Sequence, residues 1–244
     1  FTHLNLALVS SDKTVRETTK RPHTLEAYVK VVTKSYELGF KIVSYQILGL
    51  PNETLDSMIQ TLAFNARQPV LLGASPFYQT PNAPIARGMT ASETDFIKAR
   101  LTALAIETDN FCRDDIYTLF VTTRIVNFVK GLPHGFLIDL SALMSDDEID
   151  GRSRIGMELL ARLAQTGQLF SHTKQGLVEN RKFRAELFHR VLIEIGEITC
   201  QNGARINLRE FLQQLRDQKD YGVAVNVKQK VAPFSPERNT ISPP

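Results

Sequence analysis

Three apolar segments alternate with helical patterns over the first ninety residues of the chain. The segments Leu4–Val9, Lys41–Leu50 and Val70–Ser75 have the length of strands and are rich in Leu, Ile and Val, as parallel strands covered on both faces are. Between them, apolar residues recur every three or four positions, first over 25–36 and then over 55–62. Strands that alternate with helices in this way predict parallel β–α–β units.

Residues that favour helix ends stand at the boundaries of these helical patterns. Thr24 precedes the first pattern and Gly39 follows it, and Asn52 or Thr54 precedes the second. Thr and Asn side chains cap helix starts, and Gly accommodates the left-handed conformation in which helices often end. We therefore predict one helix from about Leu25 to Gly39 and a second that starts close to Leu55.

From about residue 90 the pattern becomes helical. Apolar stripes over 152–166 and 179–201 predict two helices, and a third runs from Asp114 or Asp115 to Val129. Two further helices are predicted by pairs that resemble capping boxes, Ser92 with Asp95 and Asn207 with Glu210.

These patterns divide the chain into three parts. Residues 1–89 are predicted to form an α/β part and residues 90–232 an all-α part. Residues 233–244 contain four prolines and few apolar side chains, so we expect them to be disordered. The chain begins with Phe1, directly before a strand, and we expect it to be the back half of a larger protein.

Composition and charge exclude several classes of protein. A net charge of +3 from scattered basic residues argues against nucleic-acid binding. Two cysteines are too few for a disulfide framework, which favours a reducing, cytoplasmic location. We expect neither a signal peptide nor a membrane span. Asp12 and Lys13 interrupt the first apolar run, and the most apolar later segment, 111–132, carries five charged residues.

Candidate binding residues follow the three predicted strands. Ligands of parallel α/β folds gather at the C-terminal ends of strands. The turn 49–54 (GLPNET) follows the second strand, the cationic pair Lys20-Arg21 precedes the first helix, and the aromatic segment 75–81 follows the third strand. A guanidinium, a glycine-lined backbone and an aromatic lip suit an anionic group attached to a flat heterocycle.

Together, these three segments resemble the second half of a radical S-adenosylmethionine domain. The segment KIVSYQILGLPNETLDSM resembles the fifth barrel strand of that superfamily, which ends in a G-[LF]-P-x-[EQ]-T turn. LNLALVSSDKTVRETTKRPHTLEAYVKVV resembles the fourth strand with its Arg-bearing loop and helix, and PVLLGASPFYQTPNAPIARG resembles the sixth. The resemblance covers residues 1 to about 88 and predicts the second half of a partial (β/α)6 barrel.

The resemblance implies an enzyme that cleaves S-adenosylmethionine reductively at a [4Fe-4S] cluster and so generates a 5′-deoxyadenosyl radical. The cluster of such domains is held by C-x3-C-x2-C after the first barrel strand, and this chain has only Cys112 and Cys200. The resemblance therefore places the cluster ligands in a missing N-terminal half of the barrel. It further implies a reductant such as flavodoxin or ferredoxin and an unknown small-molecule substrate.

The resemblance also assigns residues to the cosubstrate. Arg21 matches an arginine that contacts the methionine part, the Gly49 turn lies beside the adenosyl group, and Tyr78 falls where the adenine is contacted. Val9 and Tyr45 replace a glutamine and an aspartate of related members, so Ser10 and Gln46 are candidate substitutes. These departures favour a subfamily with an upstream cobalamin-binding domain. The predicted cosubstrate residues are Ser10, Arg21, Gln46, Gly49, Leu50, Pro51 and Tyr78.

An alternative interpretation makes no use of the strand ends. Residues 90–232 would be a non-catalytic helical interaction module fused to a barrel remnant. This hypothesis predicts an exposed apolar stripe on one of the late helices, wide enough to form an interface.

Overall fold

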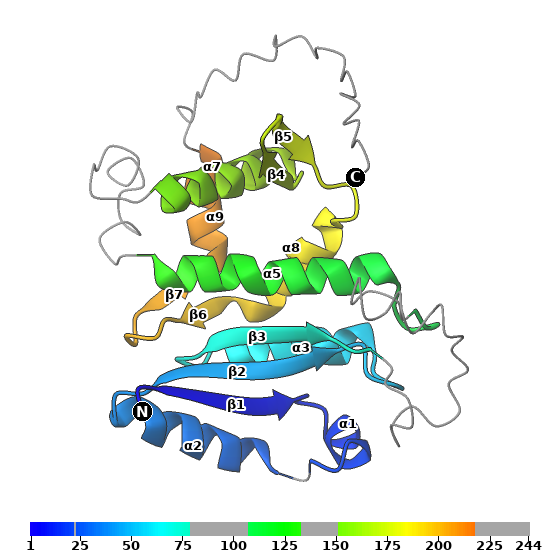
Figure 1. Cartoon of the computed structure of the whole chain (residues 1–244), viewed down its shortest axis with the longest axis vertical. Helices are drawn as coiled ribbons and strands as arrows, with labels where there is room; N and C mark the ends of the chain where they lie inside the picture. The colour runs from blue at the N-terminus through cyan, green and yellow to red at the C-terminus, as the bar shows by residue number, and fades with distance from the viewer. Residues whose placement is uncertain (22, 79–106, 133–150, 218–244) are drawn as a thin grey trace, which may run out of the picture.

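A three-stranded parallel sheet organises the N-terminal part of the protein. The computed structural model describes residues 1–21, 23–78, 107–132 and 151–217. Within these ranges the chain forms seven helices and seven strands, a mixed α/β arrangement (Figure 1). The strands β1 (His3–Val9), β2 (Lys41–Leu48) and β3 (Leu71–Pro76) pair side by side in chain order, and both pairs are parallel. The prediction of parallel β–α–β units is confirmed.

Two helices connect the three strands, and both begin where the sequence predicts. Helix α2 (Leu25–Glu37) is capped by the Thr24 side chain, which accepts a hydrogen bond from the Ala27 amide. Helix α3 (Leu55–Ala66) is capped by Thr54 in the same way. A short additional helix, α1 (Lys13–Thr18), lies in the polar stretch after β1, where no apolar periodicity predicts a helix.

The helices α2 and α3 cover one face of the sheet. Every second side chain of β2 is buried against them, and these residues are Ile42, Ser44, Gln46 and Leu48. The intervening residues Val43, Tyr45 and Ile47 lie on the opposite face, where Tyr45 keeps 43% of its surface exposed. A Cβ atom on Gly73 would lie 2.6 Å from Tyr45 Cδ1, so the Tyr45 ring lies directly across Gly73 on this open face.

The outer edge of β3 is sealed by helix α5 (Arg113–Gly131), which runs beside that strand in Figure 1. The side-chain amide of Asn127 binds both backbone groups of Leu72, as a neighbouring strand would. Its Oδ1 accepts from the Leu72 amide and its Nδ2 donates to the Leu72 carbonyl, each at 2.8 Å. Lys130 Nζ donates to the carbonyls of Gln68 and Val70 at 2.9 and 2.7 Å. Within the described residues, no strand pairs with the outer edge of β1.

The part that follows α5 combines helices with two β-hairpins. Its helices are α7 (Gly151–Thr166), α8 (Ala185–Ile195) and α9 (Leu208–Asp217). The hairpins pair β4 (Phe170–Thr173) with β5 (Gly176–Glu179) and β6 (Glu197–Thr199) with β7 (Arg205–Asn207).

The prediction of an all-α region is therefore wrong for these hairpins. Their strands are three or four residues long, too short for an alternating pattern to be recognised. Gly196, with φ of 64°, ends α8 and so divides the predicted helix over 179–201. The predicted helix after Ser92 and the predicted disordered tail 233–244 lie outside the described residues.

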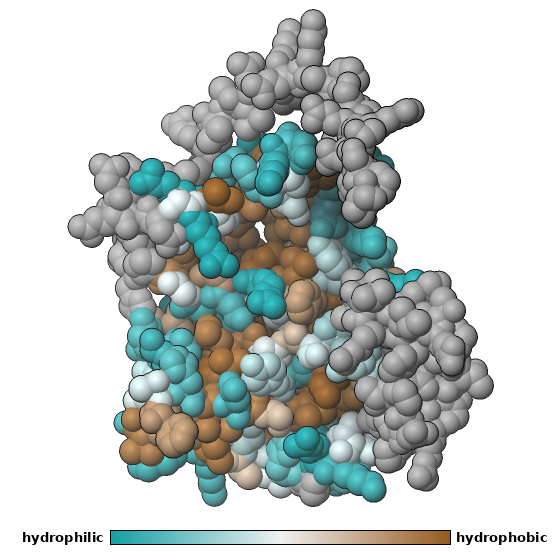
Figure 2. All heavy atoms as spheres, viewed as in Figure 1, coloured by the Kyte–Doolittle hydropathy of each residue, from teal (hydrophilic) through white to brown (hydrophobic). Residues whose placement is uncertain are grey.

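The helical part shares a core with the sheet. One apolar cluster joins Leu48 and Met58 of the β2–α3 unit to Leu119 of α5, Phe188 of α8 and Leu215 of α9. On the face drawn in Figure 2, apolar surface is visible in a hollow between the levels of α7 and α5. No helix in the described ranges is long and apolar enough to cross a membrane.

Candidate functional site

The loops that follow the three parallel strands pack against one another. Val9 at the end of β1, Val15 of α1 and Leu50 after β2 form a small buried cluster, to which Ile47 and Phe77 add partly buried contacts. The Phe77 amide also donates to the Leu48 carbonyl at 2.7 Å, which ties the exit of β3 to the end of β2. The loops that follow β1, β2 and β3 are thus neighbours at one end of the sheet.

The end of β1 carries a strained backbone. Val9 has a φ of 68°, a left-handed conformation that a β-branched residue rarely adopts, and the pairing register with β2 shifts between Ala7 and Val9. Such a conformation costs about 1–3 kcal/mol and persists only where the surroundings hold it. The 4% exposure of Val9 and its packing against Leu50 provide those surroundings.

Glu53 is the most unusual ionisable group at this end of the sheet. Its side chain is fully buried, and its Oε2 accepts hydrogen bonds from the amides of Gly49 and Leu50, both at 3.1 Å. Its Oε1 is buried without a hydrogen-bond partner. Burial raises the pKa of Glu53 from 4.5 to about 7, against the two amides and the Ser10 hydroxyl, which favour the ionised form. Glu53 stands inside the GLPNET turn, but it is not among the residues predicted from the sequence.

The position of Glu53 changes the expected role of that turn. The amides of Gly49 and Leu50 are already bound within the protein, so they are not open donors for a ligand. Gly49 has a φ of 81°, and a Cβ atom there would lie 3.2 Å from both Ile116 and Phe111. The start of α5 therefore covers Gly49, and Leu50 is 1% exposed. Both residues shape the turn from inside.

Two other predicted residues lie on the face covered by helices. Gln46 Nε2 donates to the Met58 carbonyl at 2.9 Å, and Ser10 Oγ lies 3.3 Å from Thr61 Oγ1 of α3. Both side chains are buried, with 2% and 0% exposure. They hold α3 on the sheet, so they are not in a position to substitute for ligand-binding residues of the opposite face. Since neighbours in a strand point to opposite faces, Tyr45 occupies that open face instead.

The remaining predicted residues lie at the surface beyond the strand ends. Arg21 is exposed after α1, with its amide bonded to the Arg16 carbonyl at 2.7 Å. Pro51 and Tyr78 are partly buried in the loops after β2 and β3. Arg16, which the sequence analysis did not single out, is 8% exposed, and its guanidinium donates to the carbonyls of Ser10 and Ser11. Arg16 thus supports the loop that leads from β1 to Arg21.

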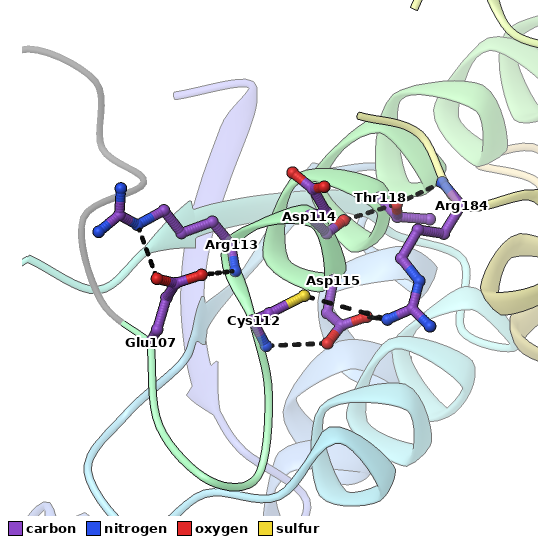
Figure 3. Close-up of polar contacts among 7 residues, drawn as sticks. All are labelled: Glu107, Cys112, Arg113, Asp114, Asp115, Thr118 and Arg184. Atoms are coloured by element: carbon purple, nitrogen blue, oxygen red, sulfur yellow. Dashed lines mark hydrogen bonds and ion pairs between the residues drawn. The ribbon is translucent and has the colours of Figure 1, made fainter. Parts of the chain in front are cut away.

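A second polar cluster, shown in Figure 3, joins the start of α5 to the start of α8. The Asp115 carboxylate is 4% exposed, accepts from the Cys112 amide at 2.9 Å and forms an ion pair with Arg184. The Arg184 amide donates to Thr118 Oγ1 at 3.0 Å, and the facing carboxylate of Asp115 raises the pKa of the Arg184 guanidinium. Asp115, Thr118 and Arg184 are thus all hydrogen-bonded to one another or to the backbone, which is typical of contacts that hold two helices together.

The cysteines do not form a metal site. Cys112 precedes α5, whereas Cys200 is buried after β6. In the described ranges, no three His, Cys, Asp or Glu side chains gather where they could hold a metal ion. The residues present here therefore do not fit a [4Fe-4S] cluster, which needs at least three cysteine ligands in the superfamily that the chain resembles.

No protein-family model, no curated protein and no solved structure matches this chain.

Proposed function

We propose that the chain is the second half of a radical S-adenosylmethionine barrel and that the C-terminal ends of β1, β2 and β3 bind part of the cosubstrate. The observation that carries this proposal is the packing of the three strand-end loops around Val9, Leu50 and Phe77. Parallel strands in chain order bring together the three segments that the sequence resemblance selects, and ligands of parallel α/β folds bind at this end.

The two edges of the sheet support a half-barrel. Asn127 and Lys130 of α5 occupy the outer edge of β3, so this edge accepts no further strand. The backbone of β1 has a partner strand on one side only within the described residues. An unpaired strand edge is a ready template for another strand. In this proposal the first half of the barrel adds its last strand beside β1.

We assign direct contact with the cosubstrate to fewer residues than the sequence resemblance implies. In the proposal Arg21 pairs with the carboxylate of the cosubstrate, because its guanidinium is exposed on the loop that Arg16 supports. Pro51 and Tyr78 offer partly buried surfaces in the next two loops. Gly49 and Leu50 act through the shape of their turn. In the superfamily that the chain resembles, a reduced cluster would supply the electron that cleaves the cosubstrate, and the cosubstrate would supply the radical that abstracts hydrogen from a substrate.

Arg21 provides a test of binding that is independent of turnover. In the complete protein from the reading frame that contains this chain, Arg21→Ala is expected to weaken S-adenosylmethionine binding about tenfold or more. A hydrogen bond to a charged group is worth about 1.5–3 kcal/mol. Equilibrium dialysis with labelled cosubstrate measures this change. Lys20→Ala, which removes the neighbouring charge, serves as the matched control and is expected to change the affinity less than about twofold.

Two results would contradict the proposed function. One is a reading frame without a C-x3-C-x2-C motif upstream of β1, since the cluster would then have no ligands. The other is equal affinity of the Arg21→Ala and Lys20→Ala proteins for the cosubstrate.

One observation favours the alternative function, a helical interaction module. Ile193 on α8 is 65% exposed, more than any other large apolar residue of the described part except Phe1. The alternative predicts an exposed apolar stripe on a late helix, wide enough to form an interface, and Ile193 is one exposed apolar residue on such a helix. It concerns a different surface from the strand ends, so the two functions are tested separately.

A further inference from the structure

A groove runs between helices α8 and α9. It has a volume of about 440 Å³. Each helix lines it with residues spaced by three and four positions, which is one face of an α-helix over two turns. On α8 these residues include His189, Leu192 and Ile193, and on α9 they include Arg209, Leu212 and Arg216.

The floor of the groove is apolar and incompletely covered. Leu192 belongs to the core of the helical part, whereas Ile193 next to it is 65% exposed. Leu212 packs partly buried against the same core from α9. The opposite side of α9 supplies Phe211 and Leu215 to that core. The two helices are therefore packed on one side and leave an apolar channel on the other.

The charges along the groove have one sign. Its ionisable lining residues are His189, Arg209 and Arg216, and none of the lining residues is acidic. Arg216 Nε donates to the Ala164 carbonyl at 3.1 Å, which holds this side chain at the end of α7. A partner that fits must bring apolar side chains to the floor and carboxylates to the rim. An amphipathic helix presents both, with apolar residues at positions i, i+3, i+4 and i+7.

We infer that the α8–α9 groove binds an acidic amphipathic helix of a partner protein. The helix lies along the channel, its apolar ridge covers Leu192, Ile193 and Leu212, and carboxylates on its flank pair with Arg209 and Arg216. The sequence of residues 218–244 does not suit this place, because it contains four Lys or Arg against two Asp or Glu. Like charges on both sides of an interface are unfavourable.

The inference can be tested with a fluorescein-labelled synthetic helix of about sixteen residues. The peptide carries leucines at i, i+3, i+4 and i+7 and glutamates on both flanks, and a matched peptide replaces every glutamate by lysine. Fluorescence polarisation with the full chain is expected to show binding of the acidic peptide at least about tenfold tighter than that of the basic one, because only the acidic peptide is complementary to the rim. The difference should decrease as salt is added.

Three substitutions locate the binding. Ile193→Asp is expected to weaken binding of the acidic peptide at least about tenfold, since it places a carboxylate on the apolar floor of the groove. Arg209→Glu is expected to weaken binding of the acidic peptide and to strengthen binding of the basic peptide. Loss of folding cannot produce this reversal. Val178→Asp on β5 is the matched control, because Val178 is also exposed, at 51%, and lies outside the groove.

Several results would overturn the inference. These are equal affinity for the two peptides, an effect of Val178→Asp as large as that of Ile193→Asp, or no reversal in the Arg209→Glu protein. A stable dimer of the chain in light scattering that Ile193→Asp dissociates would also overturn it, because a second copy would then occupy the groove.

Discussion

The buried carboxyl group of Glu53 should make the protein less stable as the pH rises. Its pKa is raised from 4.5 to about 7 by burial, so over this interval the native state binds more protons than the unfolded chain. Stability then falls with rising pH. The full stabilisation is present below pH 4.5 and is lost as the pH passes through about 7. The change in pKa corresponds to about 3 kcal/mol, since each unit is worth about 1.36 kcal/mol.

The substitution Glu53→Gln isolates this effect. Both amide bonds of the turn go to a single oxygen, Oε2, and the amide oxygen of glutamine can accept them in the same place. The nitrogen of the new side chain takes the position of Oε1, which has no hydrogen-bond partner. The variant therefore keeps the geometry of the turn and removes only the titration.

Urea unfolding followed by circular dichroism between pH 5 and 8 measures the prediction. The difference in unfolding free energy between Glu53→Gln and the unsubstituted protein should grow by about 2 to 3 kcal/mol in favour of the variant over this range. Other groups titrate in both proteins and cancel in the difference. Glu186→Gln, which removes an exposed carboxylate from the first turn of α8, controls for net charge and should leave the difference flat.

Two outcomes contradict the reasoning. A difference that stays constant with pH would mean that Glu53 titrates alike in both states. A variant that loses stability relative to the unsubstituted protein as the pH rises would mean that the two amides outweigh burial and hold the carboxylate ionised.

The remaining predictions concern helix α5. Asn127→Ala should cost about 2–3 kcal/mol in urea unfolding, because both backbone groups of buried Leu72 lose their partners; an unchanged midpoint would contradict the edge-sealing role. Burial lowers the pKa of Lys130 from 10.5 to about 7. Between these two values the native state binds fewer protons than the unfolded chain, so the protein becomes more stable as the pH rises. The free energy of unfolding should increase by about 2 kcal/mol between pH 7.5 and 9.5. Lys130→Met should abolish this rise, and its persistence would assign it to another group. Arg184→Met should cost about 1–2 kcal/mol at pH 7, a value reduced for the 49% exposure of the guanidinium; no loss would mean that water replaces it at Asp115.

The helices and strands of the first half can be predicted from local sequence patterns. Apolar runs of strand length and apolar residues spaced by three and four are properties of single segments, so they predict the parallel strands and α2 and α3 correctly. The caps Thr24 and Thr54 act on amides three residues away, and they too can be recognised in the sequence. The short hairpins could not be predicted, because three or four residues carry too little periodicity.

The roles of the polar residues at the strand ends depend on long-range packing. Strand alternation places Gln46 and Tyr45 on opposite faces, but the packing of α3 decides that Gln46 is the covered one. Glu53 binds the Gly49 amide in a buried place, and residues at the start of α5 cover Gly49. Asn127 reaches the edge of β3 from 55 residues away in the chain. Desolvation and long-range hydrogen bonds depend on which segments meet, and no single segment contains that information.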